Sequence, residues 1–365
     1  MKRRTLTGGE RADWLRLSRT RGIGPITFFH LLERYGSAAA VLEDLPSLAK
    51  KAGGKSEVPE LSDIQREIDA TAKLGAAHLA ACEPDYSICL AAIDAPPPII
   101  AIRGNRALLG QQSIAMVGAR DASAAGRRMA RDLARDLGQA GYVIVSGMAR
   151  GVDGEAHAAA MDTGTVAAIA GGIDQIYPPQ HAQLYDILAQ RGCLVSESLL
   201  GYVAQARDFP KRNRVISGLS LATIVVEAAE RSGSLITARF ALEQGREVMA
   251  VPGSPLDPRA RGANRLLKQG AALIESAEDV LNAMEGISPP SFDEPFAERF
   301  DARDADVPPA LLRAVHEALS PTPMRIEEIV RAVDAPHRLV AAALAELELA
   351  GRAVTHVGGT ASRAV

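Results

Sequence analysis

Between Pro98 and Ala283 the chain alternates short apolar, β-branched runs with amphipathic segments of helical periodicity. Parallel strands need crossover helices, and a parallel sheet covered on both faces has strands that are apolar throughout. The sequence therefore predicts an α/β fold with a Rossmann-like, doubly wound, mostly parallel sheet. Strands are expected at residues 99–102, 113–118, 142–147, 165–170, 193–197, 221–227, 247–253 and 272–276. Helices are expected at Ala124–Ala140, Asp153–Asp162, Gln180–Gln190, Arg212–Gly218, Ser234–Gln244 and Ala263–Lys268.

The 365 residues leave room for further modules on both sides of this sheet. Residues 1–85 are predicted to form a small helical domain, with amphipathic helices near residues 14–20, 22–36 and 62–76. Residues 86–286 form the Rossmann-like domain, residues 287–309 a linker and residues 310–365 a winged-helix domain. Because the linker is rich in proline and acidic residues, we expect it to uncouple the last domain from the sheet.

Both flanking domains contain an element that occurs in DNA-binding modules. The turn Gly22-Ile23-Gly24-Pro25 resembles the hairpin of helix-hairpin-helix modules, although four residues favour the interpretation as a plain turn between packed helices. Three helical segments followed by a short β turn near the C-terminus are typical of a winged helix, which binds either DNA or protein. The sequence does not decide whether this winged helix binds DNA or protein, because it carries both basic and acidic residues. They are Arg325, Arg331, Arg338 and Arg352, and Glu327, Glu328, Glu346 and Glu348.

Composition argues against several classes of protein. The formal net charge of −3 gives no overall basicity, so any DNA binding must depend on local clusters of cations. The cysteines Cys82, Cys89 and Cys193 lack the spacing of a zinc site or a disulfide framework. No G-x-G-x-x-G, G-x-S-x-G or H-x-x-x-H motif is present, which predicts no cofactor, no metal and no enzymatic activity. No stretch approaches a membrane span, so the expected location is the cytoplasm.

The predicted site lies at the carboxyl ends of the strands, where the loops of a doubly wound sheet bind ligands. The loops after residues 113–118, 142–147, 193–197 and 221–227 should converge there. The first contains Gly118-Ala119-Arg120 and the second Ser146-Gly147-Met148-Ala149-Arg150. Glycine allows close approach of the backbone, amides at helix starts favour an anion, and arginines add charge-assisted bonds. These turns predict phosphate binding, although β-α turns also favour glycine for structural reasons alone.

The segment Phe209-Pro210-Lys211-Arg212-Asn213-Arg214 is the strongest local signal. Its cations predict salt-dependent contacts to a nucleic-acid backbone, and Phe209 is suited to stack on an unpaired base. In the loop after residues 221–227, Ser232, Gly233 and Ser234 both cap a helix and offer donors to an anion. The predicted DNA-binding residues are Gly118, Arg120, Ser146, Gly147, Arg150, Phe209, Lys211, Arg212, Asn213, Arg214, Ser232, Gly233, Ser234 and Thr237.

An ordered series of motifs from about Ala95 to Ala283 resembles the DprA/Smf family. The series is VGAR, VSGMARGVDGEAH, GGIDQIYPPQH, VSES, DFPKRNRVISGLS, VVEAAERSGSLITARFALEQGREVMAVPG and GANRLLKQGA. The N-terminal region resembles the SAM-like domain of these proteins, and the C-terminal segment resembles their optional winged helix.

The resemblance implies that the chain binds single-stranded DNA without marked sequence preference and protects incoming DNA. It also implies loading of RecA during natural transformation and recombination, and a homodimer formed through the Rossmann domain. By the same resemblance the DNA pocket is lined by Arg120, Phe209, Lys211 and Arg212 and supported by Arg150, Asn213 and Ser232. The family's usual G-S-R is Gly118-Ala119-Arg120 here, so one hydroxyl is absent.

A Rossmann-fold nucleotide-binding enzyme of the phosphoribohydrolase type is the alternative function. Those enzymes carry a P-G-G-x-G-T-x-x-E loop in the place that residues 231–237 occupy here. The glutamate required for hydrolysis is missing at that spacing, where Arg239 and Ala241 stand, although Glu243 lies further along the predicted helix.

Overall fold

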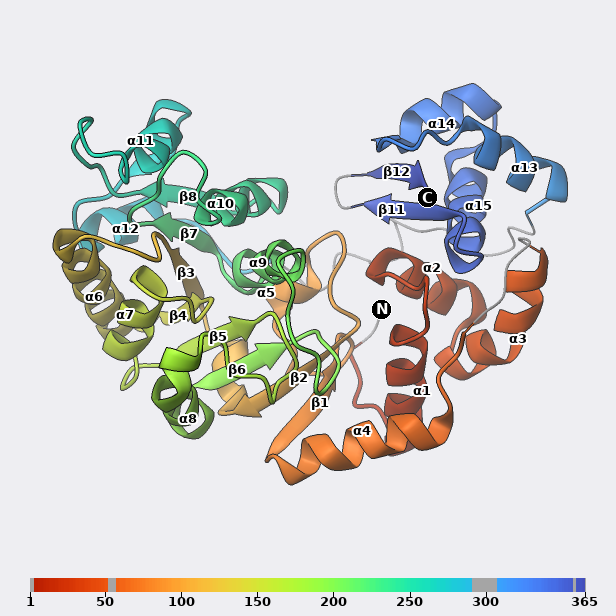
Figure 1. Cartoon of the computed structure of the whole chain (residues 1–365), viewed down its shortest axis with the longest axis horizontal. Helices are drawn as coiled ribbons and strands as arrows, with labels where there is room; N and C mark the ends of the chain where they lie inside the picture. Colours follow the sequence, from red (N-terminus) through yellow and green to blue (C-terminus); the bar gives the residue numbers. More distant parts are fainter. Residues whose placement is uncertain (1–2, 52–56, 291–306, 357–358, 365) are drawn as a thin grey trace.

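The computed structural model describes residues 3–51, 57–290, 307–356 and 359–364. Its largest element is a nine-stranded sheet, and Figure 1 shows this sheet with helices on both of its faces. The strands are β1 (Ala76–Ala80), β2 (Ile99–Gly104), β3 (Ser113–Val117), β4 (Val143–Ser146), β5 (Thr165–Ile169), β6 (Cys193–Ser196), β7 (Ala222–Val225), β8 (Glu247–Ala250) and β9 (Ala272–Leu273).

The strand order is β1-β2-β6-β5-β4-β3-β7-β8-β9. All neighbours from β6 to β9 pair in parallel, whereas β2 is antiparallel to β6 and β1 is antiparallel to β2. The predicted doubly wound, mostly parallel sheet is confirmed. Strand order reverses between β3 and β7, so the connections that follow these two strands pass to opposite faces of the sheet.

Alternate residues of the central strand β3 pack into different cores, which explains why both faces are covered. Ile114 and Met116 belong to one apolar cluster with α6, whereas Ala115 and Val117 belong to another with α9. The helices of this domain are α5 (Ile88–Ala91), α6 (Ala124–Gln139), α7 (Val152–Ala159), α8 (Ala182–Arg191), α9 (Asp208–Leu219), α10 (Ser234–Glu243), α11 (Arg261–Lys268) and α12 (Ala277–Ala283).

Helix α9 begins at Asp208, one turn before the predicted start at Arg212. Pro210 therefore lies in the first helical turn, where the missing N–H of proline removes no helical hydrogen bond. The Asp208 carboxylate accepts hydrogen bonds from the Tyr202 hydroxyl at 2.6 Å and from the Gln205 amide at 2.8 Å. These contacts secure the loop that enters α9.

The N-terminal helical domain consists of α1 (Gly8–Ser18), α2 (Pro25–Tyr35), α3 (Ala38–Lys51) and α4 (Leu61–Lys73). Helix α3 was not predicted, and it contains Pro46 in its interior, a residue that normally argues against a continuous helix. In the core of the helical domain, Trp14 of α1 and Phe28 and Phe29 of α2 form an edge-to-face aromatic cluster. This core is continuous with one core of the sheet domain.

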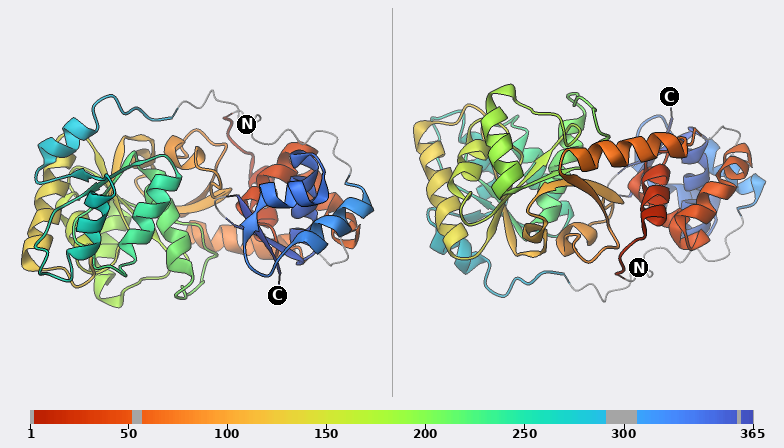
Figure 2. Two further views of the ribbon diagram at one scale, coloured as in Figure 1. Left: turned by 90° about the horizontal axis from the view of Figure 1, so that it is seen from above. Right: turned by 90° about the horizontal axis from the view of Figure 1, so that it is seen from below.

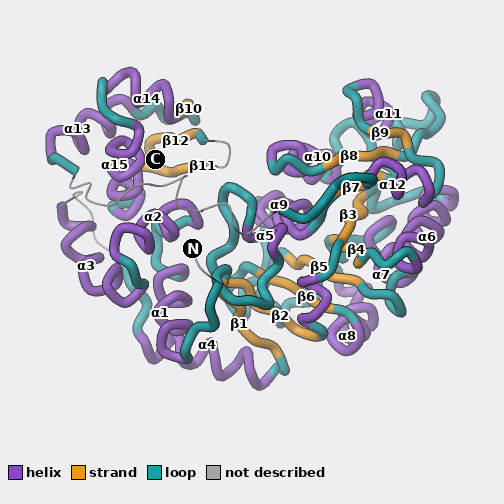
Figure 3. The backbone as a smooth tube through the Cα atoms, turned by 180° about the vertical axis from the view of Figure 1, so that it is seen from behind, coloured by secondary structure: helices purple, strands orange, loops and turns teal. Residues whose placement is uncertain are grey.

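The C-terminal domain has the predicted winged-helix layout. It contains α13 (Pro309–Ala318), α14 (Ile326–Val333), α15 (His337–Leu349) and a small sheet of order β10-β12-β11, formed by β10 (Met324–Arg325), β11 (Ala353–His356) and β12 (Thr360–Arg363). The linker was expected to uncouple this domain from the sheet, and the structure shows a contact that was not predicted: α15 packs against α2 and α3 of the helical domain, as Figures 2 and 3 show. Residues 291–306 of the predicted linker lie outside the described part of the chain.

Candidate functional site

A pocket of about 330 Å³ lies at the carboxyl ends of the strands. Its lining comes from the loops after β3, β4, β5 and β6 and from the first turn of α9. Of the predicted residues, the structure brings together Arg120, Gly147, Arg150, Phe209 and Arg212 around this pocket. We refer to it below as the crevice.

An aromatic pair with two arginines beside it forms one wall of the crevice. The ring centres of Phe209 and Tyr177 lie 5.3 Å apart at an interplanar angle of 57°. The guanidinium carbons of Arg120 and Arg212 lie 5.5 Å and 5.8 Å from the centre of the Phe209 ring, within the range of cation–π contacts. Tyr177 is 51% exposed, so this wall offers an accessible ring next to a cation.

Arg120, Arg150 and Lys211 are the predicted cations that are exposed to solvent. Arg150 makes an ion pair with Asp121 at 3.4 Å, but this pair is exposed and therefore weak. An incoming phosphate can replace the carboxylate of such a pair at little cost. Arg120 and Arg150 thus place two accessible positive charges on the crevice.

Arg212 is 8% exposed, and its guanidinium is engaged inside the protein. It donates to the carbonyl oxygens of Gly147 and Ala168 and, through Nε, to the Asn213 side chain at 3.2 Å. Burial lowers the pKa of Arg212 to about 10, and nearby Asp153 opposes this shift. Arg212 therefore stays charged at neutral pH and ties the loop after β4 to the end of β5.

Arg214 lies away from the crevice and is 6% exposed. Its Nη2 donates to both carboxylate oxygens of Glu197, at 2.5 and 2.6 Å, and its Nη1 donates to the carbonyl of Ala95. Asn213 is buried too and donates to the carbonyl of Gly233. The three cations of this segment therefore have different environments, and only Lys211 is open to solvent.

The amides at two of the predicted anion-binding helix starts bind carboxylates of the chain itself. The Asp153 carboxylate accepts from the amides of Gly147 at 3.1 Å and Ala149 at 3.2 Å, at the start of α7. At the start of α6, the Glu227 carboxylate accepts from both the amide and the hydroxyl of Ser123. The expectation that these amides face an external phosphate is wrong for the groups named, because an internal anion already occupies them. Burial raises the pKa of Asp153.

Gly118 is required by packing. A Cβ atom there would lie 2.5 Å from the Val152 side chain, so glycine allows α7 to approach the loop after β3. Ser146 is fully buried and donates to the carbonyl of Met116 at 2.6 Å. The described residues that line the crevice do not include the predicted residues at the start of α10, which are Ser232, Gly233, Ser234 and Thr237.

The loop after β5 contributes crevice residues that were not predicted. Gln175, Ile176, Tyr177 and Pro178 all line the pocket, and Val203 from the loop after β6 is 69% exposed at its rim. The available signal was an aromatic residue followed by two prolines shortly after a predicted strand, in the segment IYPPQ. Its position at the carboxyl end of a central strand marks it as a site loop.

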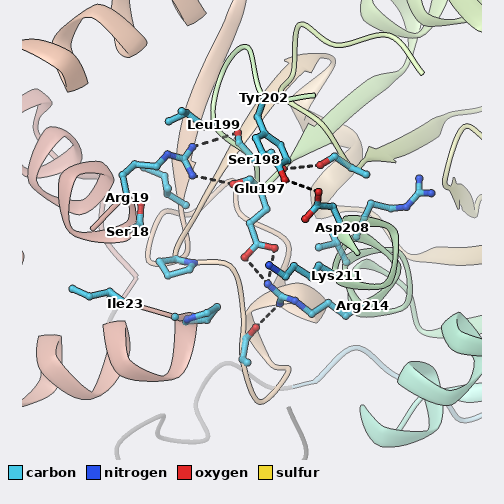
Figure 4. Close-up of a pocket in the computed structure, with 18 of the residues that line it drawn as sticks. Ser18, Arg19, Ile23, Glu197, Ser198, Leu199, Tyr202, Asp208, Lys211 and Arg214 are labelled. Atoms are coloured by element: carbon cyan, nitrogen blue, oxygen red, sulfur yellow. Dashed lines mark hydrogen bonds and ion pairs between the residues drawn. The ribbon is translucent and has the colours of Figure 1, made fainter. Parts of the chain in front are cut away.

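A second, larger cavity of about 630 Å³ lies on the other side of the α9 start, between the sheet, the helical domain and β11 (Figure 4). Lys211 lines this cavity. Arg19 reaches across from α1 and donates to the carbonyl oxygens of Glu197 at 3.0 Å and Ser198 at 3.4 Å. The helical domain is thereby joined to the sheet next to α9.

The fold and the crevice define a doubly wound α/β protein with an arginine- and aromatic-lined pocket at its ligand-binding edge, flanked by two small domains. Residues 77–285 match the family model of DNA recombination-mediator protein A. Residues 8–70 match the DprA-like N-terminal HHH domain, and residues 301–359 match the DprA winged helix domain. The chain belongs to this DprA/Smf family.

Curated relatives include the DNA processing protein DprA of Bacillus subtilis, which is 41% identical over 239 residues, 64% of this chain and 80% of that protein. Protein Smf of Escherichia coli is 40% identical over 270 residues, 72% of this chain and 71% of that protein. Among solved structures, DprA from Streptococcus pneumoniae has a TM-score of 0.62 and 31% identity, covering 77% of this chain and 98% of that one. DprA from Helicobacter pylori, whose single-stranded DNA binding mode was studied, has a TM-score of 0.53 and 28% identity, covering 57% of this chain and 95% of that one.

The phosphoribohydrolase alternative needs a carboxylate at the site. Glu243 is exposed on α10 and forms an ion pair with Arg239 at 3.4 Å, and it lines a separate small pocket with Asp94, so it is not a lining residue of the crevice.

The described residues contain no group of three side chains suited to hold a metal ion. Among them, too, no helix is both long and apolar enough to cross a membrane.

Proposed function

We propose that this protein binds single-stranded DNA in the crevice. The observation that carries the proposal is the combination of the exposed cations Arg120 and Arg150 with the accessible ring pair Tyr177 and Phe209. Cations provide affinity for the phosphate backbone, and rings stack on unpaired bases, which a duplex keeps inside its own stack. Lys211 extends the positive charge past the start of α9.

The test is a titration of the full chain with single- and double-stranded DNA of equal length at several salt concentrations. We expect tighter binding of the single strand at every salt concentration and similar affinity for different sequences. Equal affinity for both forms at matched salt would contradict the proposal. Incubation with nucleoside monophosphates, followed by chromatography for free base, tests the alternative enzymatic function, and we expect no product.

We further propose that the bound strand is protected and passed to a RecA recombinase in the cytoplasm during natural transformation and recombination. Family membership supports this role. A RecA-loading assay on single-stranded DNA should show faster filament formation with the wild-type protein than with Arg120→Ala. Equal rates would separate RecA loading from the crevice.

We also propose a homodimer formed through the Rossmann-like domain. Support comes from the short edge strand β9, whose Leu273 is 52% exposed, and from Leu281 of the following helix α12, which is 37% exposed. Exposed apolar groups at a sheet edge favour association with a second copy. Sedimentation analysis should give a dimer for the wild type and a monomer for Leu273→Asp. A dimer that survives this substitution would place the interface elsewhere.

A further inference from the structure

The helix-hairpin-helix-like turn of the N-terminal domain is covered by the last helix of the chain. A Cβ atom on Gly22 would lie 2.6 Å from the carbonyl oxygen of Glu348 and 3.6 Å from Cα of Leu349. Gly22 also has a φ of +81°, in the left-handed region that favours glycine. The side chain of Leu349 is buried in the apolar cluster that contains Trp14 and Phe28. The backbones of the hairpin and of α15 therefore meet directly, with apolar packing beside them.

Buried polar contacts fix the position of α15 on this surface. The Thr27 hydroxyl donates to the Glu348 carboxylate, which also accepts from the amide and hydroxyl of Thr355 at 3.0 and 2.9 Å. Arg34 of α2 pairs with Glu346 at 3.1 Å, and their side chains are only 16% and 3% exposed. Buried charged pairs of this kind depend strongly on geometry, so they select one docked arrangement.

Helix α15 precedes the β hairpin of the winged helix, and in DNA-binding members of the helix-turn-helix class this helix enters the major groove. Here the second half of α15, residues 342–349, is buried, whereas His337 and Arg338 in its first turn are exposed. The side chains of this half that meet the helical domain include the apolar Leu349 and the carboxylates Glu346 and Glu348, and these carboxylates would repel phosphate. They complement the cation of Arg34 and the hydroxyl of Thr27 instead.

We propose that the second half of α15 is a protein-docking segment whose partner is this chain's own helical domain, and that it and the hairpin at Gly22 bind each other and are thereby closed to DNA. This goes beyond the proposed function, which rests on the crevice alone. It assigns the winged helix to protein binding, a choice that its mixed charge leaves open at the level of sequence.

The experiment uses the full chain with Arg34→Glu, which places a carboxylate against Glu346 and leaves α15 itself unchanged. Hydrogen exchange should become at least about tenfold faster in α2 and in the second half of α15, because the buried pair is lost. The double variant Arg34→Glu/Glu346→Arg should return exchange to the wild-type rate. Arg21→Glu is the matched control, since Arg21 lies in the same domain with its side chain 82% exposed, and it should leave exchange unchanged.

The same variants are titrated with duplex DNA, and we expect the affinity of Arg34→Glu to stay within about twofold of the wild type. A gain of about tenfold or more would overturn the proposal, because α15 would then be a DNA-reading helix masked by the helical domain. Unchanged exchange in Arg34→Glu would overturn it as well. If a melting scan shows that Arg34→Glu does not fold, the milder Thr27→Ala is measured against the same two criteria.

Discussion

Replacing Arg212 with alanine separates a structural role from a DNA-contacting role. The variant loses the donors to the carbonyl oxygens of Gly147 and Ala168 and leaves the buried Asp153 carboxylate without its nearby cation. A hydrogen bond from a charged group is worth about 1.5–3 kcal/mol, and removing one partner of a buried charge pair costs about 3–5 kcal/mol. Because these contributions overlap, we expect the Rossmann-like domain to lose about 3–5 kcal/mol of stability.

The assay is a calorimetric melting scan of the full chain, with Arg120→Ala as the matched control. For a domain of this size, the expected loss corresponds to a Tm lowered by about 6–20 °C. Arg120 is exposed, so its removal should shift Tm by no more than about 2 °C. The control should instead weaken single-stranded DNA binding and reduce the slope of log affinity against log salt by about 0.7.

The reasoning is refuted if Arg212→Ala has the same Tm as the wild type and if its slope of log affinity against log salt falls by as much as that of Arg120→Ala. That outcome is the signature of an arginine that contacts phosphate directly, as the sequence alone suggested. It would mean that the bonds to the carbonyl oxygens of Gly147 and Ala168 do not stabilise the DNA-free protein and that the guanidinium contacts phosphate when DNA binds.

Three further outcomes follow from the structure. Phe209→Ala should weaken single-stranded DNA binding by about 1–3 kcal/mol without changing the salt slope, as measured by titration, because stacking involves no counterions; a changed slope would point to a lost charge contact. Gly126→Ala places a methyl group 2.1 Å from the Glu227 carboxylate, which Ser123 holds in place, and should cost about 1–3 kcal/mol in a denaturation experiment; wild-type stability would show that Glu227 moves aside. Burial lowers the pKa of His157 to about 3, below its value of about 6.5 in the unfolded chain. The neutral imidazole therefore contributes its full stability above about pH 6.5, and this contribution is lost as the pH falls toward about 3. At pH 5 the free energy of unfolding should be lower by about 2 kcal/mol. His157→Gln should flatten this dependence in denaturation curves recorded between about pH 7 and 5, and an unchanged curve would assign it to another group.

The structure also shows why His157 resists protonation. The Thr165 hydroxyl donates to the carbonyl of Ile144 at 2.7 Å, so it accepts from Nδ1 of His157 at 2.7 Å. The other ring nitrogen, Nε2, is buried with no hydrogen-bond partner among the described residues. Protonation would place an N–H on that nitrogen without an acceptor, which a buried site disfavours.

The prediction of the sheet succeeded because its evidence is local. Apolar strands and amphipathic helices are visible within windows of a few residues, and a parallel sheet follows from their alternation. The same alternation predicts which loops lie at the carboxyl edge of the sheet. Arg120, Arg150 and Phe209, which belong to or follow these loops, line one pocket in the structure. Helix α3 was missed because Pro46 lies inside it.

The sequence by itself determined the sheet, its flanking domains and the segments that supply cations and a ring to one edge. It did not distinguish Lys211, Arg212 and Arg214, because adjacent residues of a helix point in different directions, and what lies on each side depends on distant strands. Only the tertiary structure placed Arg212 against two backbone carbonyls and Arg214 against Glu197, while Lys211 kept its access to solvent. The tertiary structure also showed that internal carboxylates accept hydrogen bonds at the starts of α6 and α7, and that α15 packs on the helical domain. These contacts join residues far apart in the sequence, such as Thr27 and Glu348, so no local pattern reveals them.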